Sequence, residues 1–384
     1  MSLRVRLRPR LKHMASVVFL AGVFASSAHP AGGGRTPERN PRLADLPDNT
    51  AIDLGRYDCE SRVPHLNCAT IFDYSRINYD PYSHRMLVFG GGHAATGRTD
   101  VDAFDMTSLD WKSLYTSMSC DQVKQGDLDP RGFHRATGHP AARHTYDQNV
   151  IVDVGGRPQL MMFSNEGFSG HCHSYKAPMQ AVASLSLAGP SARWEFGPQE
   201  AMPWRYAGAA EFDPPSGKVI LLNAKSRSSM WVYDPATHAV VAVVGLGIAN
   251  ASSSNLVYYP PSRALYLIDS KTSDVHEITL DRSDWAKSRA KRIDARGDAP
   301  GSMRNFAYDA RNRIIGGVRQ GTFYAFNPST ATWSSRKMLA QANGGAAVGS
   351  VAHHALDYDS VNNVFVFVTD RDSGRRTWAY RYQR

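Results

Sequence analysis

The 384-residue sequence predicts an all-β protein, a β-propeller made of repeated four-stranded blades. Three observations lead to this fold. A short unit recurs along the chain, in which an apolar strand, commonly ending in an aromatic residue and an aspartate, is followed by a tight polar turn and a second apolar strand. A third strand follows this hairpin, commonly with a tryptophan-bearing fourth strand behind it. The units recur at intervals of about 50 residues over most of the chain.

Six copies of this unit are visible. Proline, glycine, asparagine and serine at the turns supply the backbone angles of a hairpin, while β-branched and aromatic residues beside them favour strands. The period is near that of kelch repeats, so we expect a kelch-like propeller with six blades, and the chain length leaves room for a seventh. The copies begin at Ile77 (INYDPYSHRMLVFGG), Val152 (VDVGGRPQLMMFS), Glu211 (EFDPPSGKVILLN), Tyr258 (YYPPSRALYLID), Ala307 (AYDARNRIIGGV) and Asp357 (DYDSVNNVFVFV).

The last blade lacks a fourth strand of its own, because the chain ends at RTWAYRYQR. A segment near Thr50 to Gly55 is therefore expected to complete this blade and close the ring with an N-terminal strand. Closure hides sheet edges that would otherwise be open to association. Because no linker divides the chain, we expect residues 43–384 to form a single domain.

The N-terminus has the order of a secretory signal. Five basic residues precede an apolar run from Met14 to Phe24, and the small residues up to Ala28 follow it,. We expect residues 1–28 to be removed and the protein to be secreted or periplasmic. The apolar run is too short to span a bilayer, and no later stretch approaches that length. Residues 29–42 are rich in glycine, proline and arginine and are expected to be disordered.

The charge and the cysteines limit the partners and cofactors. The formal net charge of +9 falls to about +4 once the five basic signal residues are removed, and no basic block suggests nucleic acid,. Of the four cysteines, Cys59 and Cys68 are the expected disulfide pair. Cys120 and Cys172 could form a second pair, or Cys172 could bind a metal ion with its neighbours His171 and His173. We expect no required cofactor, with a structural metal ion as the lesser alternative.

Blade topology sorts the reactive side chains onto one face, which we call the loop face. Loops that join second to third strands, and those that join one blade to the next, open on this face, and the aspartate turns open on the other. The motif GGGH, residues 90–93, follows a second strand, and RHTY, residues 143–146, begins a first strand. Loops on a rigid scaffold often carry function. The same rule places on this face His171, His173, Tyr175, Arg205, Tyr206, Arg227, Lys271, Arg304, His353 and His354.

At GGGH and RHTYD the sequence resembles the kelch-like bacterial proteins related to the propeller polysaccharide lyases that cleave ulvan. This resemblance implies β-elimination at a uronic acid of an acidic polysaccharide. It gives the two histidine roles to His93 and His144, and places a tyrosine and an arginine in the next blade. Tyr206 and Arg227 have the matching topology, and Tyr175 and Arg205 are their rivals. The long insertion between the two histidines departs from the family pattern and leaves the substrate open.

The β-elimination reaction requires a positively charged side chain beside the uronate carboxylate as well as a base. The proton beside a uronate carboxylate is too weakly acidic to remove until the carboxylate is neutralised, which a guanidinium can do. Tyr206 and a histidine then form the acid-base pair, and which of them is the base stays open. The expected catalytic residues are His93, His144, Tyr206 and Arg227. The expected substrate-binding residues are Arg143, His173, Tyr175, Arg205, Lys271 and Arg304.

Other activities fit the sequence less well. Glycoside hydrolysis usually needs two facing carboxylates, and the loop face offers few. A copper radical oxidase would need a cysteine placed to crosslink a tyrosine, for which there is no signature. The main alternative is a non-catalytic propeller, expected to be a monomer, that binds a glycan or a protein.

Overall fold

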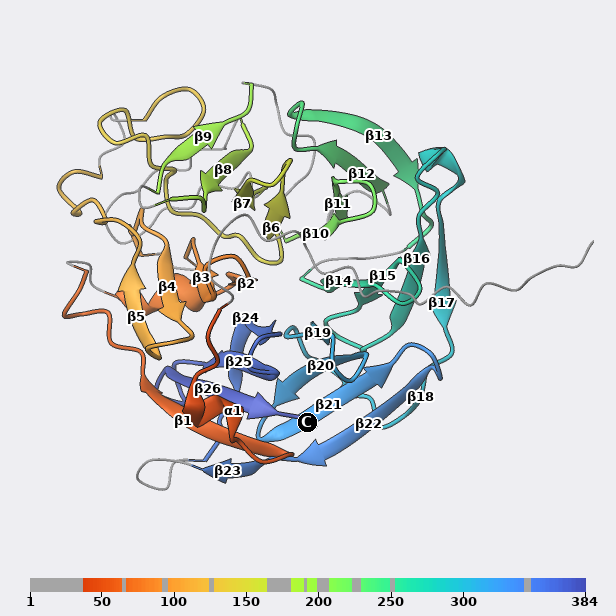
Figure 1. The fold of residues 1–384 in the computed structure, drawn as a ribbon. Coiled ribbons are helices and arrows are strands. Elements are labelled where there is room, and N and C mark those ends of the chain that lie inside the picture. Colours follow the sequence, from red (N-terminus) through yellow and green to blue (C-terminus); the bar gives the residue numbers. More distant parts are fainter. Residues whose placement is uncertain are drawn as a thin grey trace, which may run out of the picture.

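Six sheets surround one axis in the described residues of the computed structural model (Figure 1). The predicted all-β propeller is therefore confirmed, with six blades. The strands of blades 1 to 4 follow chain order from the axis outwards. The structure describes residues 37–63, 67–91, 96–123, 128–163, 181–189, 192–198, 207–222, 229–248, 253–341 and 347–384.

The first three blades have four strands each. Blade 1 contains β2 (Ile77–Asp80), β3 (Arg85–Val88), β4 (Asp102–Asp105) and β5 (Asp110–Ser113). Blade 2 contains β6 (Asn149–Asp153), β7 (Pro158–Met162), β8 (Ala183–Ser186) and β9 (Trp194–Phe196). Blade 3 contains β10 (Ala209–Asp213), β11 (Lys218–Leu222), β12 (Ser229–Asp234) and β13 (Ala239–Gly245).

The last three blades complete the ring. Blade 4 contains β14 (Asn255–Tyr259), β15 (Ala264–Ile268), β16 (Val275–Thr279) and β17 (Arg289–Ile293). Blade 5 contains β19 (Ala307–Asp309), β20 (Ile314–Arg319), β21 (Thr322–Asn327), β22 (Thr332–Lys337) and β18 (Arg296–Gly297). Blade 6 contains β24 (Val351–Asp359), β25 (Val364–Thr369), β26 (Arg376–Arg381), β1 (Thr50–Arg56) and β23 (Leu339–Gln341). The helical elements are α1 (Pro41–Ala44), η1 (Cys68–Phe72) and η3 (Trp285–Lys287).

The aspartate of the repeated unit organises the turn between first and second strands. Asp80, Asp309 and Asp359 are fully buried. In each case the carboxylate accepts the backbone N–H two residues further on, at 3.0, 2.8 and 2.9 Å. An aspartate in this role replaces a backbone turn bond. The repeat is thus visible in the sequence in part because blades 1, 5 and 6 share the same local hydrogen bond.

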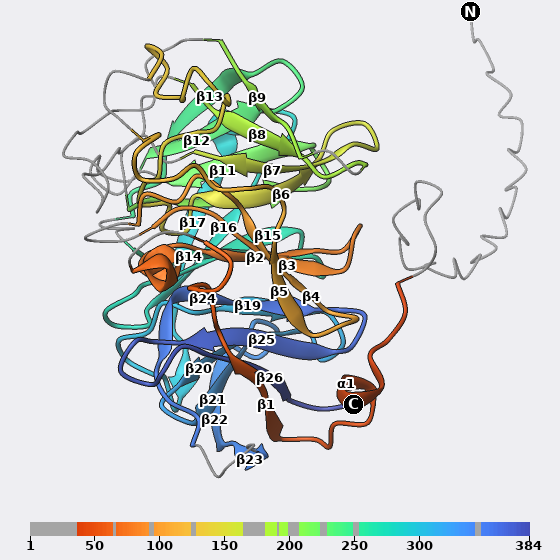
Figure 2. The same cartoon turned by 90° about the vertical axis from the view of Figure 1, so that its left-hand side faces the viewer.

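The N-terminal strand closes the ring as predicted. β1 pairs antiparallel with β26, from Thr50 opposite Arg381 to Arg56 opposite Arg376, and so forms the fourth strand of blade 6. Figure 2 shows β1 alongside β26, with α1 near the C-terminus. Two further strands were not predicted: β23 pairs parallel with β1, and β18 pairs parallel with β22. They cover the outer edges of blades 6 and 5.

The segment before β1 is anchored to the propeller over its described part. The Asn40 backbone N–H donates to Asn362 Oδ1 at 2.9 Å, and its side-chain amide donates to the Thr107 carbonyl at 2.6 Å. Asn40 also caps α1 through the N–H of Arg42. Disorder was expected for residues 29–42, and this expectation does not hold for 40–42, because these hydrogen bonds hold the chain in place. Residues 1–36, including the predicted signal, lie outside the described residues.

The cysteines form disulfides where the structure describes them. Cys59 and Cys68 are bonded, with their Cα atoms 6.0 Å apart, as predicted. Cys120 is also disulfide-bonded, and its partner lies outside the described residues. Disulfides fit a protein that leaves the cytosol. Among the helices of the described residues, none is long and apolar enough to cross a membrane.

Candidate functional site

Several inner strands pass through a left-handed residue where they reach the axis on the loop face. The backbone angle φ is +58° at Tyr74, +46° at Tyr146 and +61° at His354, values that residues with a Cβ rarely adopt,. The Tyr146 N–H donates to the Tyr74 carbonyl at 2.6 Å, and the His354 N–H donates to the Arg304 carbonyl at 3.1 Å. Backbone hydrogen bonds thus tie neighbouring blades together at this end of the axis.

Four rings gather at this end, and we call Tyr74, His144, Tyr146 and His353 the aromatic cluster. The Tyr74 ring centroid lies 4.4 Å from that of His353, 5.4 Å from that of Tyr146 and 5.8 Å from that of His144. The Tyr146 hydroxyl lies 3.4 Å from Nδ1 of His144. His144 is fully buried, whereas Tyr74 and His353 are only half-buried. The exposed side of the cluster is therefore formed by blades 1 and 6.

Arg304 lies against the aromatic cluster and carries a charge with no acidic partner. Its Nη1 lies 3.2 Å from Nε2 of His353. Burial, then the charge of Arg304, lowers the pKa of His353 to about 4, so this imidazole is neutral near pH 7,. Within the described part of the chain, Arg304 forms no ion pair, and its Nε is buried without a hydrogen-bond partner. The guanidinium therefore has donors available for an anion.

A second polar group lies on the inner strands, and we call Arg76, Asp147, Glu211 and Asp357 the axial charge cluster. Arg76 comes from the start of blade 1 and reaches blades 2 and 3. Its Nη2 donates to Glu211 Oε2 at 3.0 Å, its Nη1 donates to the Ala210 carbonyl at 2.9 Å, and its Nε lies 3.5 Å from Asp147 Oδ1. One guanidinium thus faces three carboxyl groups.

Burial makes these carboxyl groups weak acids. It raises the pKa of Asp147 to about 7, against the lowering effect of Arg76 and of the Leu256 N–H, which donates at 2.9 Å. Burial also raises the pKa of Glu211 and of Asp357. Because a single arginine cannot neutralise three carboxylates in a place of low dielectric, the cluster holds protons more tightly than exposed acids do.

His354 connects the two clusters. Its Nδ1 lies 3.9 Å from Asp147 Oδ1 and 3.3 Å from the Asn255 side-chain nitrogen. Burial, then the neighbouring His353 and Arg304, lowers the pKa of His354 well below its ordinary value. This histidine is therefore neutral near pH 7 and acts as a polar bridge without charge.

The structure brings the motifs GGGH and RHTY together, as the topology predicted, in the part that it describes. The Gly91 N–H donates to the Arg143 carbonyl at 3.1 Å. Gly90 has φ of +122°, and a Cβ there would lie 2.8 Å from the same carbonyl and 2.9 Å from the Thr145 side chain. Glycine is required at this position because the two segments approach so closely.

Four of the predicted site residues lie in the described part of the chain. His144 and Arg304 take part in the arrangement described above. Arg143 is buried, and it donates to the carbonyls of Ala141 and Gly132 at 2.9 and 3.3 Å, within the insertion before it. Lys271 is exposed in the β15–β16 turn on the loop face. The roles of all four in binding or catalysis stay predictions.

The other predicted residues lie outside the described residues. They comprise the catalytic assignments His93, Tyr206 and Arg227, the binding assignments His173, Tyr175 and Arg205, and the alternative metal ligands His171 and Cys172. Among the residues that the structure does describe, no group of three or more histidine, cysteine, aspartate or glutamate side chains could hold a metal ion.

Sequence reasoning missed the axial charge cluster and Tyr74. Arg76 and Asp147 stand just before the inner strands β2 and β6, and Glu211 lies in the inner strand β10 between apolar residues. A charged residue in such a strand is a usable signal, because it must find a partner on another blade when it is buried. The sequence contained this signal, but not the identity of the partner.

The fold and this site define the chain as a six-bladed β-propeller with a polar site at the axial end of its loop face. No family model matches the chain, and no curated protein matches it. Solved structures with the same architecture exist, and each shares little sequence with this chain.

Two of these structures are auxiliary nutrient binding proteins from Bacteroides thetaiotaomicron and Bacteroides ovatus. Both have a TM-score of 0.50. The B. thetaiotaomicron protein is 9% identical to this chain, and the match covers 90% of this chain and 75% of that protein. The B. ovatus protein is 12% identical, and the match covers 89% of this chain and 74% of that protein. A protein of unknown function from B. thetaiotaomicron also has a TM-score of 0.50, at 10% identity over 87% of this chain and 75% of its own. At such identities the likeness shows the fold alone.

Proposed function

We propose that the protein binds an acidic, uronic-acid-containing polysaccharide on its loop face, with Arg304 holding a sugar carboxylate. The observation that carries this proposal is the guanidinium of Arg304, which has no acidic partner in the described residues and lies beside a neutral histidine. Charged side chains that are withdrawn from water are usually paired with a group of opposite charge. Here a ligand carboxylate would take that place.

The surroundings of Arg304 suit a sugar as well as a carboxylate. His353 is neutral near pH 7, so its ring nitrogens can exchange hydrogen bonds with hydroxyl groups,. Tyr74 packs against His353 and is half-buried, which leaves part of an aromatic side chain near the cation. A guanidinium with donors in a plane can bind a carboxylate through two hydrogen bonds. Lys271, exposed on the same face, would add a second positive charge further along the chain of sugars.

Two structural neighbours titled auxiliary nutrient binding proteins agree with a binding role for this architecture. Their low identity transfers no ligand, so the proposal depends on the side chains named above. The mildly basic mature chain is compatible with a polyanion.

The test is calorimetric titration with ulvan, glucuronan, alginate, pectin and glycosaminoglycans. Arg304→Gln should weaken binding roughly ten- to hundredfold, because a charge-assisted hydrogen bond contributes about 1.5–3 kcal/mol. Arg311→Gln is the matched control. It removes the same charge from an exposed position in the β19–β20 turn, on the opposite face. Binding that the two variants weaken equally would mean that only net charge matters, and binding of none of the polymers would reject the proposal.

A second candidate function is the lyase reaction, and the contact between His144 and Tyr146 favours it. A hydroxyl 3.4 Å from an imidazole nitrogen is an arrangement suited to proton transfer,. The close packing of GGGH against RHTY also agrees with the resemblance noted from the sequence. However, His144 is fully buried. Its cover would have to move before the imidazole could contact a glycan, and for this reason we place binding first.

Absorbance of the unsaturated sugar separates the two functions, because only elimination creates a new double bond. If the polymers that bind are also cleaved, His144→Ala should abolish turnover while binding through Arg304 persists. Activity of His144→Ala within tenfold of the original protein would exclude His144 as the catalytic base or acid. Tight binding without any unsaturated product would leave the protein a binding propeller.

A further inference from the structure

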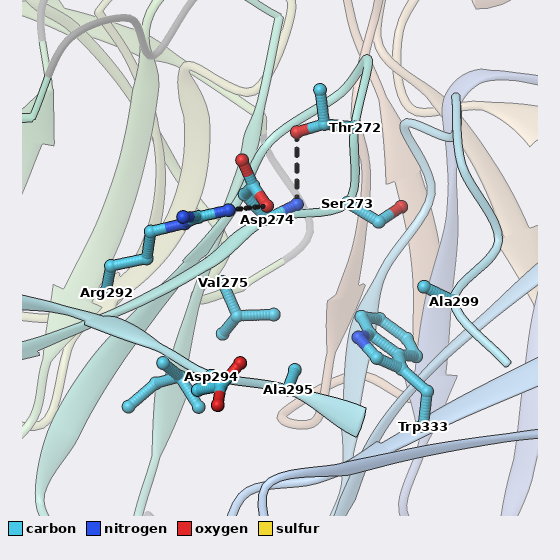
Figure 3. Close-up of a pocket in the computed structure, with 10 residues that line it drawn as sticks. Thr272, Ser273, Asp274, Val275, Arg292, Asp294, Ala295, Ala299 and Trp333 are labelled. Carbon is cyan, nitrogen blue, oxygen red and sulfur yellow. Dashed lines mark hydrogen bonds and ion pairs between the residues drawn. The ribbon is translucent and has the colours of Figure 1, made fainter. Parts of the chain in front are cut away.

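A separate cavity of about 350 Å³ lies at the rim between blades 4 and 5 (Figure 3). One wall is formed by the β15–β16 turn and the start of β16, with Thr272, Ser273 and Asp274. A second wall is formed by the end of β17, with Arg292, and by the segment from Asp294 to Ala299 that leads into blade 5. Trp333 of β22 closes the far side. The cavity opens near the loop face at the outer rim, whereas Arg304 lies at the axial end of the same junction between blades 4 and 5.

Hydrogen bonds hold the walls of this cavity in place without a ligand. The Ser270 carbonyl accepts the Met303 N–H at 3.1 Å and the Ser302 hydroxyl at 3.2 Å, which ties blade 4 to the segment before β19. β18 pairs with β22 at Gly297, where φ is +94° and a Cβ would lie 2.2 Å from the Trp333 carbonyl. The segment that forms the second wall is thus fixed directly against the tryptophan.

Trp333 provides an unsatisfied donor. Its side chain is 4% exposed, and its ring packs against Phe306 and Phe326 at centroid distances of 5.8 and 5.1 Å. Its Nε1 is buried and has no hydrogen-bond partner. Figure 3 shows this nitrogen on the side of the ring that is turned towards Ala295 and the middle of the cavity. A buried donor without a partner costs about 1–3 kcal/mol, which an acceptor on a ligand would recover.

The opposite side of the cavity offers acceptors and one cation. Arg292 donates to Asp274 at 2.8 Å, and the Asp274 N–H donates to the Thr272 hydroxyl at 3.2 Å. Asp294 is exposed at the edge. Two carboxylates against one guanidinium leave the cavity with an excess negative charge. An anion such as a uronate or a phosphate is therefore disfavoured, whereas hydroxyl groups, which donate to carboxylates, are favoured.

We propose that this cavity binds a single uncharged pyranose residue. Sugar hydroxyls would donate to Asp294 and to the free acceptor positions of Asp274, and a sugar oxygen would accept the indole N–H of Trp333. Ala295 and Ala299 provide the apolar surface for a C–H face of the sugar ring. The inference goes beyond the function proposed above, because the ligand is neutral and the site lies at the rim of the propeller and not at its axis.

The first experiment observes the indole N–H of Trp333 directly by ¹H–¹⁵N NMR. The protein is titrated with glucose, galactose, mannose, xylose and N-acetylglucosamine, with glucuronate as the charged comparison. A sugar that binds in the cavity should shift the Trp333 indole signal at millimolar concentration. Trp111 supplies an internal control, because its Nε1 already donates to Thr377 Oγ1 at 2.8 Å and its signal should not move.

Variants then test the assigned contacts. Trp333→Phe removes the N–H and keeps most of the ring, and Asp294→Asn removes an exposed charge that the fold does not need. Each should weaken sugar binding roughly three- to tenfold, the effect of one hydrogen bond. Trp111→Phe should leave binding unchanged. The proposal is rejected if no sugar of the panel moves the Trp333 signal, if glucuronate binds best, or if both Trp333→Phe and Asp294→Asn bind like the original protein.

Discussion

Asp147→Asn is expected to change how the stability of the propeller depends on pH. Asp147 is buried among inner strands, and its pKa is raised from an ordinary value of 3.8 to about 7. The folded protein therefore binds a proton at this site more tightly than the unfolded chain does. Stability from this proton is fully present below pH 4 and is lost as the pH rises through 7.

The magnitude follows from the difference in pKa. At 1.36 kcal/mol for each pKa unit, the shift of Asp147 corresponds to roughly 4 kcal/mol over the full titration. About 2–3 kcal/mol of this loss falls between pH 5 and pH 8. An asparagine does not ionise, and its side-chain oxygen can still accept the Leu256 N–H. The free energy of unfolding of Asp147→Asn, relative to the original protein, should therefore rise by about 2–3 kcal/mol from pH 5 to pH 8.

The assay is urea unfolding followed by tryptophan fluorescence at four pH values from 5 to 8. Asp372→Asn serves as the control, since it removes the same carboxylate from an exposed position in the β25–β26 turn. If the difference between Asp147→Asn and the original protein varies by less than about 0.5 kcal/mol over this range, the axial charge cluster does not hold a proton in the way described.

Three further predictions concern the fold. Gly90→Ala should cost more than about 2 kcal/mol, because its Cβ would contact a backbone carbonyl, whereas Gly156→Ala, with open space around it, should cost about 1 kcal/mol in urea unfolding,. A chain without β1 should lose cooperative thermal unfolding and associate on size exclusion, and a monodisperse, cooperative product would contradict ring closure. The double variant Cys59→Ser, Cys68→Ser should be less stable than the oxidised original protein by roughly 2–3 kcal/mol, and as a control the two proteins should be about equally stable under reducing conditions,.

The parts of the fold that were predicted correctly depend on local interactions. The aspartate turns are an example, because the carboxylate of Asp309 binds the N–H of Arg311 only two residues away. The disulfide between Cys59 and Cys68 joins residues nine apart. Ring closure by β1 could be predicted by counting, since the last blade lacked one strand. The parallel strands β18 and β23 were missed because two or three residues at a sheet edge leave no periodic pattern.

The site was predicted only in part, because its contacts join residues that are far apart in the sequence. Blade topology placed His144 and Arg304 on the loop face, and it correctly predicted that Gly90 and Gly91, the described part of GGGH, lie next to RHTY. The contact of Arg304 with His353 joins residues 49 apart, and that of Arg76 with Glu211 joins residues 135 apart. Residues so far apart in the sequence leave no local pattern from which their contact could be predicted. Trp333 lies on a tryptophan-bearing fourth strand of the predicted kind, but its unsatisfied N–H depends on what surrounds it.

By itself the sequence determined the repeat, the turns, the close disulfide and the face on which the histidines and arginines lie. These features follow from hydrogen bonds and strand periods within a few tens of residues. Only the tertiary structure decided which of these side chains are charged, paired or buried. Charge state depends on desolvation and on neighbours from other blades, as in Asp147 and His353,. Chemistry in a propeller arises where blades meet, because each blade contributes a few polar groups that acquire partners only when the ring has closed.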